Sequence, residues 1–304
     1  MRRRLAPGAR HPGLGKLKEQ QPTMALRDLC EQYGISFKKQ LGQNLLLDDN
    51  INRIMVDAAG VTPEEDVIEV GAGLGALTGR LAERARRVLA IEIDRSFMPC
   101  LEDQFGGNDR VRLFRGDVLN HDVEKLVEEF LPGAQTLKMV SNLPYYITTP
   151  VLFHFWECTV PFERMVVMMQ EEVALRMVDP VNGPDYGVLA LAASLFSDVD
   201  IVHKVPRTCF RPQPRVDSCI VRMRRHDARY PGLEPKFLMR IIRSAFAQRR
   251  KTLRNSLTKS GTFGAPQDVV LAAFEATGID PGRRPQTMSL DEFAALAREI
   301  RKGI

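Results

Sequence analysis

Three acidic residues and a glycine-rich turn lie at positions that suit a small bound ligand. The turn is the segment EVGAGLG (69–75), which follows a short apolar run and precedes a helix-like one. Glu92 and Asp117 come at the ends of the next two apolar runs. Carboxylates accept hydrogen bonds from ribose hydroxyls and amino groups, and a glycine turn lets a ligand approach the backbone closely. These residue types indicate a nucleoside-containing ligand.

The spacing narrows the identity of that ligand. The three glycines do not have the G-x-G-x-x-G spacing of dinucleotide-binding turns, and the acid before them would repel a diphosphate but attract an ammonium group. We therefore predict S-adenosylmethionine as the cofactor. It would contact Glu69, Gly71 and Gly73 at its amino-acid end, Glu92 at its ribose and Asp117 at its adenine. A dinucleotide is the competing ligand, and any one of these acids taken alone would suit a helix N-cap.

The segment SNLPYY (141–146) supplies groups suited to methylating an exocyclic amine. The lone pair of adenine N6 is delocalised into the ring, so two acceptors that hold its hydrogens out of plane make it a better nucleophile. We predict that Asn142 Oδ1 and a backbone carbonyl of Leu143 or Pro144 are these acceptors, and that Tyr145 stacks on the base. Positioning and electrostatics would then carry the rate, with no metal and no covalent nucleophile. The alternative is an Asn-Leu-Pro turn whose tyrosine rings pack internally.

The elements that must position these residues alternate between strand and helix from residue 66 to about 205. The predicted strands are 66–71, 88–93, 111–116, 137–142, 164–169, 198–205 and 216–224. The first five favour a parallel sheet, and the last two an antiparallel pair at its edge. We expect an α/β fold with a Rossmann-like class I methyltransferase sheet, followed by a small all-helical domain. The predicted boundaries are 24–230 for the cofactor-binding domain and 231–304 for the helical RNA-binding domain.

The charge is unevenly distributed along the 304 residues. Residues 222–254 contain eleven Lys and Arg against two acids, which leaves 32 basic and 36 acidic residues elsewhere. Such asymmetry favours a polyanionic partner, although a solvated charged face gives the same pattern. No run of 18 apolar residues exists, and the five cysteines form no CxxC pair, so we expect neither a membrane span nor a zinc site. A reducing cytoplasm is the expected location.

Residues 1–23 differ from the rest of the chain. The first 18 residues contain six basic residues and no acid, with Pro and Gly throughout, and they lack the apolar run of a secretory signal. We expect a basic, disordered tail, or a start of the natural protein at Met24.

A helical wheel over residues 236–257, treated as one helix, separates basic from apolar residues. The predicted phosphate-binding stripe is Arg240, Arg243, Arg250, Lys251 and Arg254. The opposite, apolar face is Leu238, Ile242, Ala245, Phe246 and Leu253. Arg249 falls on the apolar side, so we predict an intramolecular partner for it. A solubilising charged face is the alternative, but it would normally include acids, and this helix has none.

Several motifs in order resemble one enzyme family over roughly residues 35–300. They include GQNLL (42–46), IEID (91–94), GDVL (116–119), NLPYYITTPVLFH (142–154), FRPQPRVDS (210–218), AFAQRRKTLRNSL (245–257) and GIDPGRRPQTMS (278–289). Together with the glycine turn, these motifs are similar to those of the KsgA/RsmA-type small-subunit ribosomal RNA adenine N6,N6-dimethyltransferases. One departure is Leu45-Leu46, where family members often have Phe-Leu.

The resemblance implies a substrate and further site residues. The family dimethylates two adjacent adenosines in a hairpin loop near the 3′ end of small-subunit rRNA, on an immature 30S particle. By resemblance, Gln43 and Asn44 help to hold the cofactor, together with Leu46, Ile93 and Val118 from the same motifs. Phe210 would be the second aromatic wall of the base, opposite Tyr145. We expect a monomer without bound metal.

Three other functions fit parts of the sequence. An Erm-type enzyme would methylate one adenosine of large-subunit rRNA, but the segments 248–257 and 278–289 argue against it. A DNA adenine methyltransferase would more typically carry Asp in place of Asn142 and a target-recognition insert. A third alternative is a ribosome-assembly checkpoint factor, for which methylation serves mainly for release.

Overall fold

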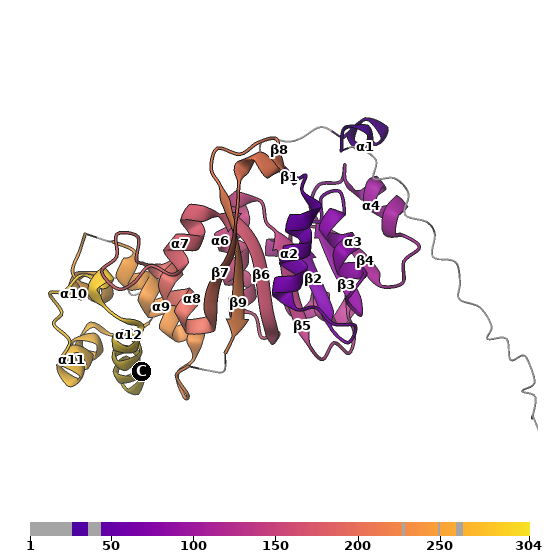
Figure 1. Cartoon of the computed structure of the whole chain (residues 1–304). Helices are drawn as coiled ribbons and strands as arrows, with labels where there is room; N and C mark the ends of the chain where they lie inside the picture. Colours follow the sequence, from indigo (N-terminus) through magenta and orange to yellow (C-terminus); the bar gives the residue numbers. More distant parts are fainter. Residues whose placement is uncertain (1–25, 36–43, 227–228, 249, 260–263) are drawn as a thin grey trace, which may run out of the picture.

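A seven-stranded sheet forms the centre of the molecule (Figure 1). The computed structural model describes residues 26–35, 44–226, 229–248, 250–259 and 264–304. The strand order across the sheet is β4-β3-β2-β5-β6-β9-β7. The strands are β2 (Asp66–Val70), β3 (Arg87–Glu92), β4 (Val111–Arg115), β5 (Leu137–Asn142), β6 (Phe162–Gln170), β7 (Ser197–Val205) and β9 (Ser218–Arg225).

The sheet is parallel except at one edge. Strands β4, β3, β2, β5 and β6 run parallel, and β9 lies antiparallel between β6 and β7. The predicted mostly parallel sheet with an antiparallel edge is therefore confirmed. A separate two-stranded ladder pairs β1 (Leu45–Leu46) with β8 (Phe210–Arg211) and joins two distant segments above one end of the sheet (Figure 1).

Helices cover both faces of the sheet, because alternate strand residues point to opposite faces. Val67 and Val166 pack in the layer of α2, α3 and α4, whereas the adjacent Ile68 and Val167 pack in the layer of α5, α6 and α8. The helices up to this point are α1 (Leu26–Gln32), α2 (Asp49–Ala59), α3 (Ala76–Ala82), α4 (Met98–Phe105), α5 (Val123–Phe130), α6 (Thr148–Glu157), α7 (Glu171–Met177) and α8 (Val188–Phe196).

The C-terminal helices gather beyond the antiparallel edge of the sheet (Figure 1). They are α9 (Pro235–Phe246), α10 (Leu253–Thr258), α11 (Gln267–Thr277) and α12 (Leu290–Lys302). Their buried side chains, such as Phe237 and Phe293, belong to the same apolar cluster as Phe155 and Phe196 from the sheet layer. The helical region therefore shares one continuous core with one face of the sheet.

The prediction of a single helix over residues 236–257 was wrong. α9 ends at Phe246 and α10 begins at Leu253. The side chain of Thr252 caps α10, and the backbone N–H groups of Leu253 and Arg254 donate to the carbonyls of Arg283 and Pro281 at 2.8 and 3.0 Å. A distant loop thus satisfies the N–H groups that a continuous helix would have used internally.

Two other predictions cannot be followed in the structure. The tail at residues 1–23 and the partner of Arg249 lie outside the described residues. Within the described ranges, no helix combines the length and apolar character that crossing a membrane requires.

The turn between β2 and α3 provides a test of the fold. Gly75 has a φ of 84°, and a Cβ at this position would lie 2.5 Å from Phe105 Cε2. We expect Gly75→Ala to lower the free energy of unfolding by about 2 kcal/mol or more, because left-handed strain adds to overpacking.

Two matched variants separate these contributions in urea unfolding. Gly133 has a φ of 71° with open space around its Cα, so Gly133→Ala should cost about 1 kcal/mol from strain alone. Gly107 has open space and no positive φ, so Gly107→Ala should be nearly neutral. Equal effects at all three positions would contradict the packing role of Gly75.

Candidate active site

The glycine turn is bent tightly at the carboxyl end of β2. Gly71, Gly73 and Gly75 have φ values of 79°, 56° and 84°, in the left-handed region that side chains other than glycine rarely adopt. The N–H groups of Gly71 and Ala72 donate to the Ile91 carbonyl at 2.8 and 3.2 Å. The turn is therefore held against the end of β3, where Glu92 follows.

The same turn contacts the NLPYY segment. The backbone N–H of Val70 donates to the buried Ser141 hydroxyl at 2.9 Å. A Cβ on Gly71 would lie 3.4 Å from Pro144 Cδ and 3.7 Å from the Asn142 carbonyl oxygen. The strand order places β2 beside β5, so two sequence motifs about 70 residues apart meet in one crevice.

Glu92 is held by backbone donors. Its two carboxylate oxygens accept hydrogen bonds from Gly73 N and Asp94 N, each at 2.8 Å. Burial raises the pKa of the Glu92 carboxyl, and these backbone hydrogen bonds act in the opposite direction. Each carboxylate oxygen has a further lone pair, so the fixed side chain can also accept from ligand hydroxyls.

Glu69 is enclosed more completely than the sequence indicated. Its side chain is 1% exposed and accepts a hydrogen bond from Thr78 Oγ1 at 2.6 Å. Burial raises the pKa of the Glu69 carboxyl to about 8, and the nearby Glu92 contributes in the same direction. The predicted contact of Glu69 with an ammonium group would relieve the cost of a buried charge, and it stays a prediction.

Asp117 caps the short turn that follows β4. Its carboxylate accepts from Leu119 N and from Asn120 Nδ2, both at 3.0 Å. The capping role that was the alternative is thus present, and it leaves lone pairs for an adenine amino group.

Two apolar side chains near these acids are exposed: Ile93 is 45% exposed and Tyr146 is 51% exposed. Burial raises the pKa of Tyr146, and the carboxylates of Asp117 and Glu92 contribute in the same direction.

The predicted cofactor fits this set of groups. Backbone-held carboxylates suit ribose hydroxyls, the exposed apolar side chains of Ile93 and Tyr146 suit a purine ring, and the buried Glu69 suits an ammonium group.

The other predicted cofactor residues come from neighbouring segments. Leu46 and Asn44 lie next to Leu45, whose Cδ2 would be 3.4 Å from a Cβ at Gly73. Val118 is buried directly after Asp117. Gln43 lies outside the described residues.

The two candidate carbonyls of the NLPYY segment differ in the hydrogen bonds that they accept. The Pro144 carbonyl accepts from Ile147 N at 3.1 Å and from Thr148 Oγ1 at 3.3 Å. Among the described residues, no hydrogen bond to the Leu143 carbonyl is found. The Leu143 carbonyl, next to Asn142, is therefore the better partner for an amino group of a substrate.

Tyr145 is anchored by a residue that sequence reasoning missed. Its hydroxyl lies 2.7 Å from the Ser218 hydroxyl, and Ser218 is fully buried at the first position of β9. Ser141 and Thr78 were missed in the same way, because each is a small hydroxyl residue whose role depends on a distant strand or turn. The only sequence signal was position: Ser218 and Ser141 lie within the FRPQPRVDS and SNLPYY motifs, and Thr78 follows the glycine turn.

Phe210 does not present its ring to solvent. It is 1% exposed and packs in the cluster that contains Val205 and Ile220, while its backbone pairs with Leu46. Contact with a substrate base would require the Phe210 side chain to turn out of this cluster. Its predicted role as a second aromatic wall stays a prediction.

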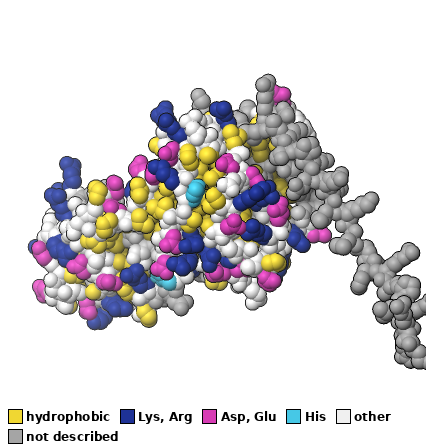
Figure 2. Space-filling model, viewed as in Figure 1, with side chains coloured by type: hydrophobic (Ala, Val, Ile, Leu, Met, Phe, Trp, Pro, Cys, Tyr) yellow, Lys and Arg dark blue, Asp and Glu magenta, His cyan; other side chains and the backbone are white. Residues whose placement is uncertain are grey.

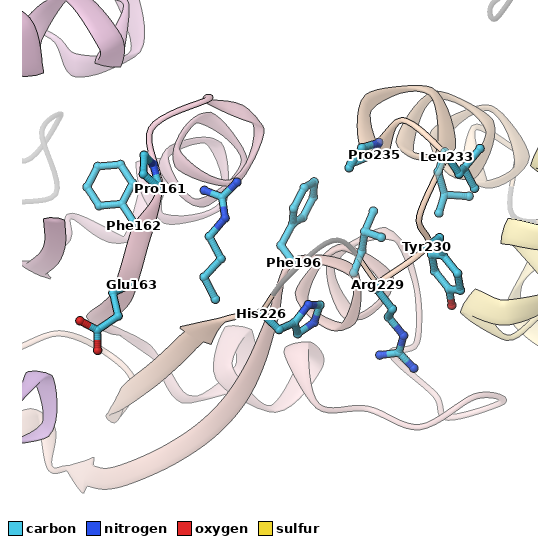
Figure 3. A pocket seen from close by; sticks show the side chains of 12 residues that line it. Pro161, Phe162, Glu163, Phe196, His226, Arg229, Tyr230, Leu233 and Pro235 are labelled. Atoms are coloured by element: carbon cyan, nitrogen blue, oxygen red, sulfur yellow. The ribbon is translucent and has the colours of Figure 1, made fainter. Parts of the chain in front are cut away.

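One hollow in the described part of the chain lies elsewhere. It has a volume of about 410 Å³ and includes Phe162 and Glu163, at the amino end of β6, together with Phe196, His226 and Tyr230 (Figure 3). Asn142 pairs with Met168 near the opposite end of β6. This hollow is therefore separate from the crevice that gathers the predicted site.

The basic stripe is exposed but does not form one surface of one helix. Arg240 and Arg243 lie on α9, whereas Arg250 and Lys251 precede α10 and Arg254 lies in its first turn. Arg243 has intramolecular partners. It forms an ion pair with Glu157 at the end of α6, and its guanidinium lies 4.7 Å from the centre of the Phe153 ring. The predicted apolar face is buried, as expected.

Cysteine and metal chemistry are not apparent in the described residues. All five cysteines are free thiols, and no group of three or more His, Cys, Asp and Glu side chains is placed to hold a metal ion.

A parallel sheet with a left-handed glycine turn and acidic residues at successive strand ends defines a class I S-adenosylmethionine-dependent methyltransferase. A family model described as ribosomal RNA adenine dimethylase matches residues 34–302. The chain belongs to this family and is an S-adenosylmethionine-dependent rRNA adenine dimethyltransferase. The fold and the cofactor predicted from the sequence are confirmed.

Curated relatives match most of the chain. It is 41% identical over 276 residues to the ribosomal RNA small subunit methyltransferase A of Bacillus cytotoxicus, which covers 90% of this chain and 94% of that protein. It is 42% identical over 277 residues to the enzyme of the same name from Geobacillus kaustophilus, with coverage of 90% and 94%.

Solved structures share the fold. A dimethyladenosine transferase from Plasmodium falciparum superposes with a TM-score of 0.69 at 24% identity, covering 85% of this chain and 98% of that chain. The 23S rRNA methyltransferase ErmE superposes with a TM-score of 0.58 at 26% identity, covering 84% and 99%. A dimethyladenosine transferase and a 23S rRNA methyltransferase thus share this architecture.

The burial of Glu69 generates a test of stability against pH. Its pKa rises from 4.5 to about 8 on folding, so the folded chain binds this proton more tightly than the unfolded chain. The contribution of the Glu69 carboxyl to the free energy of unfolding is fully present below pH 4.5 and is lost as the pH rises through about 8. In cofactor-free protein we expect the free energy of unfolding to fall over this range, by an amount on the order of a few kcal/mol.

Glu69→Gln is the matched variant, because its amide oxygen can still accept from Thr78. Urea unfolding of both proteins at pH 5 and pH 8 measures the difference. The pH-dependent loss should be clearly smaller in the variant, and equal losses in both proteins would show that the Glu69 carboxyl is not the responsible group.

Proposed function

We propose that this enzyme dimethylates N6 of two adjacent adenosines in the hairpin loop near the 3′ end of small-subunit rRNA, within an immature 30S particle. Support comes from the identity of 41–42% to enzymes named small subunit methyltransferase A, against 26% to ErmE. In this proposal the enzyme acts in the cytoplasm as a monomer and needs no metal.

The observation that carries the proposal is the junction of the glycine turn with the NLPYY segment. S-adenosylmethionine, when bound, supplies an activated methyl group on sulfur. A Cβ on Gly71 would lie 3.4 Å from Pro144 Cδ, so a cofactor held by the turn would lie beside an amine held by Asn142. No covalent intermediate on the protein is needed, and rate enhancement follows from positioning.

The substrate amine would be held by two oxygens of the protein. Asn142 Oδ1 and the Leu143 carbonyl would each accept one N6 hydrogen, which draws the hydrogens out of the ring plane and restores lone-pair density on nitrogen. Tyr145 would support one face of the base, and its hydrogen bond to Ser218 keeps the ring in a fixed position. Phe210 would cover the other face once its side chain turned out of the cluster that contains Val205 and Ile220.

The exposed cations after α9 would contact the RNA backbone. Arg250, Lys251 and Arg254 are exposed and have no ion-pair partner among the described residues. The guanidinium carbon of Arg240 lies 5.4 Å from the centre of the Phe237 ring, and because Arg240 is exposed, its charge stays accessible to a phosphate. Arg243 differs from the others because Glu157 already neutralises it.

The substrate assignment is tested with labelled cofactor. Tritiated S-adenosylmethionine is offered with immature unmethylated 30S particles, unmethylated 50S particles or adenine-containing duplex DNA, and the product is digested and chromatographed. We expect N6,N6-dimethyladenosine from 30S particles alone. Label in 50S particles, or in duplex DNA, would contradict the proposed substrate.

The basic residues give a second test. Reversing Arg250 and Arg254 to Glu should weaken RNA binding and reduce the slope of log K against log salt by roughly one unit for each phosphate that the protein no longer binds. Arg243→Gln should leave that slope nearly unchanged and instead lower thermal stability, because it removes the ion pair between α9 and α6. A reduced salt slope for Arg243→Gln, together with a wild-type slope for the Arg250 and Arg254 reversals, would contradict this assignment of the RNA contacts.

A further inference from the structure

A second basic segment lies outside the one that the charge count singled out. Residues 203–216 contain Lys204, Arg207, Arg211 and Arg215 and no acid. This segment includes β8 and most of the connection to β9, and it surrounds Phe210. Arg211 pairs with Leu45, whose Cδ2 would lie 3.4 Å from a Cβ at Gly73, so the segment lies beside the glycine turn. In contrast, α9 and α10 lie beyond the antiparallel edge of the sheet (Figure 1).

The backbone of this segment is fixed at several points. Leu47 N donates to the Cys209 carbonyl at 2.8 Å, and Arg211 pairs with Leu45 in the β1–β8 ladder. Arg207 N donates to Asp217 Oδ1 at 3.0 Å, and the Arg207 guanidinium donates to the Arg215 carbonyl at 3.1 Å. The cations are thus carried on a defined scaffold and not on an open loop.

Within the described residues, only Lys204 of these four cations forms an ion pair. The acids of this neighbourhood, Glu171 and Asp217, lie 2.8 and 3.8 Å from Lys204 Nζ. Arg211 and Arg215 are exposed, and within the described residues neither side chain forms an ion pair or a hydrogen bond. Exposed guanidinium groups without intramolecular acceptors are suited to bidentate contact with phosphate.

The surface view agrees with this placement. In Figure 2, Lys and Arg side chains project from the upper edge of the molecule, where Figure 1 shows β8 and its connection to β9. Apolar side chains accompany them: Val216 is 42% exposed directly after Arg215, and Tyr146 is 51% exposed on the NLPYY side of the crevice. Cations beside exposed apolar groups are typical of surfaces that bind single-stranded nucleic acid.

We propose that Arg211 and Arg215 form a phosphate-binding rim that holds the RNA strand on either side of the adenosine entering the crevice. The proposal rests on the proposed function and adds a specific ligand: the phosphodiesters of a single-stranded RNA loop. Arg211 adjoins Phe210, so a phosphate bound there lies next to the base that Phe210 would cover. Arg207 supports the rim by holding the Arg215 carbonyl.

The test compares Arg211→Gln/Arg215→Gln with wild-type protein and with a control. Arg112→Gln/Arg110→Gln removes the same charge around the start of β4, at the opposite edge of the sheet. The probe is an unmethylated hairpin RNA with an adenosine-containing loop, and its affinity is measured from low to moderate salt. S-adenosylmethionine affinity is measured separately by calorimetry.

We expect the rim variant to reduce the salt slope by roughly 0.7 per phosphate contact, or about 1.4 in total, with unchanged cofactor affinity. The control should keep the wild-type slope. A wild-type slope in the rim variant would overturn the proposal, and so would an equal reduction in the control, which would indicate net charge alone. Failure of the wild-type protein to methylate small-subunit rRNA would refute the proposed function. The salt slope of RNA binding would still test the phosphate-binding rim in that case.

Discussion

The hydrogen bond from the Val70 backbone N–H to the Ser141 hydroxyl joins the two segments on which the site depends. One segment is the glycine turn after β2, and the other is NLPYY after β5. Strand order makes these neighbours, and the bond fixes how far apart their ends lie. Methyl transfer without a covalent intermediate depends on the alignment of donor and acceptor, so a small displacement at this junction would matter more than a change elsewhere.

Burial of acidic side chains is the second constraint on the crevice. Glu69 and Glu92 are almost fully enclosed, and a charged carboxylate in such a place is costly unless it is hydrogen-bonded. Backbone N–H groups and Thr78 meet part of that requirement. A ligand with an ammonium group and ribose hydroxyls would meet the rest. The site is thus better satisfied with its cofactor than without it, which links cofactor binding to stability.

The positions of the strand ends could be predicted because each depends on a pattern of neighbouring residues in the sequence. Short apolar runs ending in glycine or an acid indicated the parallel sheet, and the absence of a long helix between the last two strands indicated its antiparallel edge. Features that depend on distant partners could not be predicted. The start of α10 after the break is held by the carbonyls of Pro281 and Arg283, and Arg243 is neutralised by Glu157 on α6.

The site itself shows the same division between local and distant information. The residue types of the NLPYY segment indicated two candidate carbonyls, but only the fold shows that Ile147 and Thr148 already use the one on Pro144. The anchoring of Tyr145 by Ser218 joins residues 73 positions apart. Phe210 gave no local signal at all, and its nearly complete burial reflects the β1–β8 ladder, which pairs segments about 165 residues apart.

The central claim is that Asn142 acts on the bound amine in the methyl-transfer step. Single-turnover kinetics of Asn142→Ala, with cofactor and immature 30S particles both saturating, test it directly, because saturation removes any effect on binding. We expect the rate of methyl transfer to fall by roughly 10²–10³-fold, the usual cost of removing one well-placed polar group from a transition state. A rate within about twofold of wild type would contradict this role of Asn142.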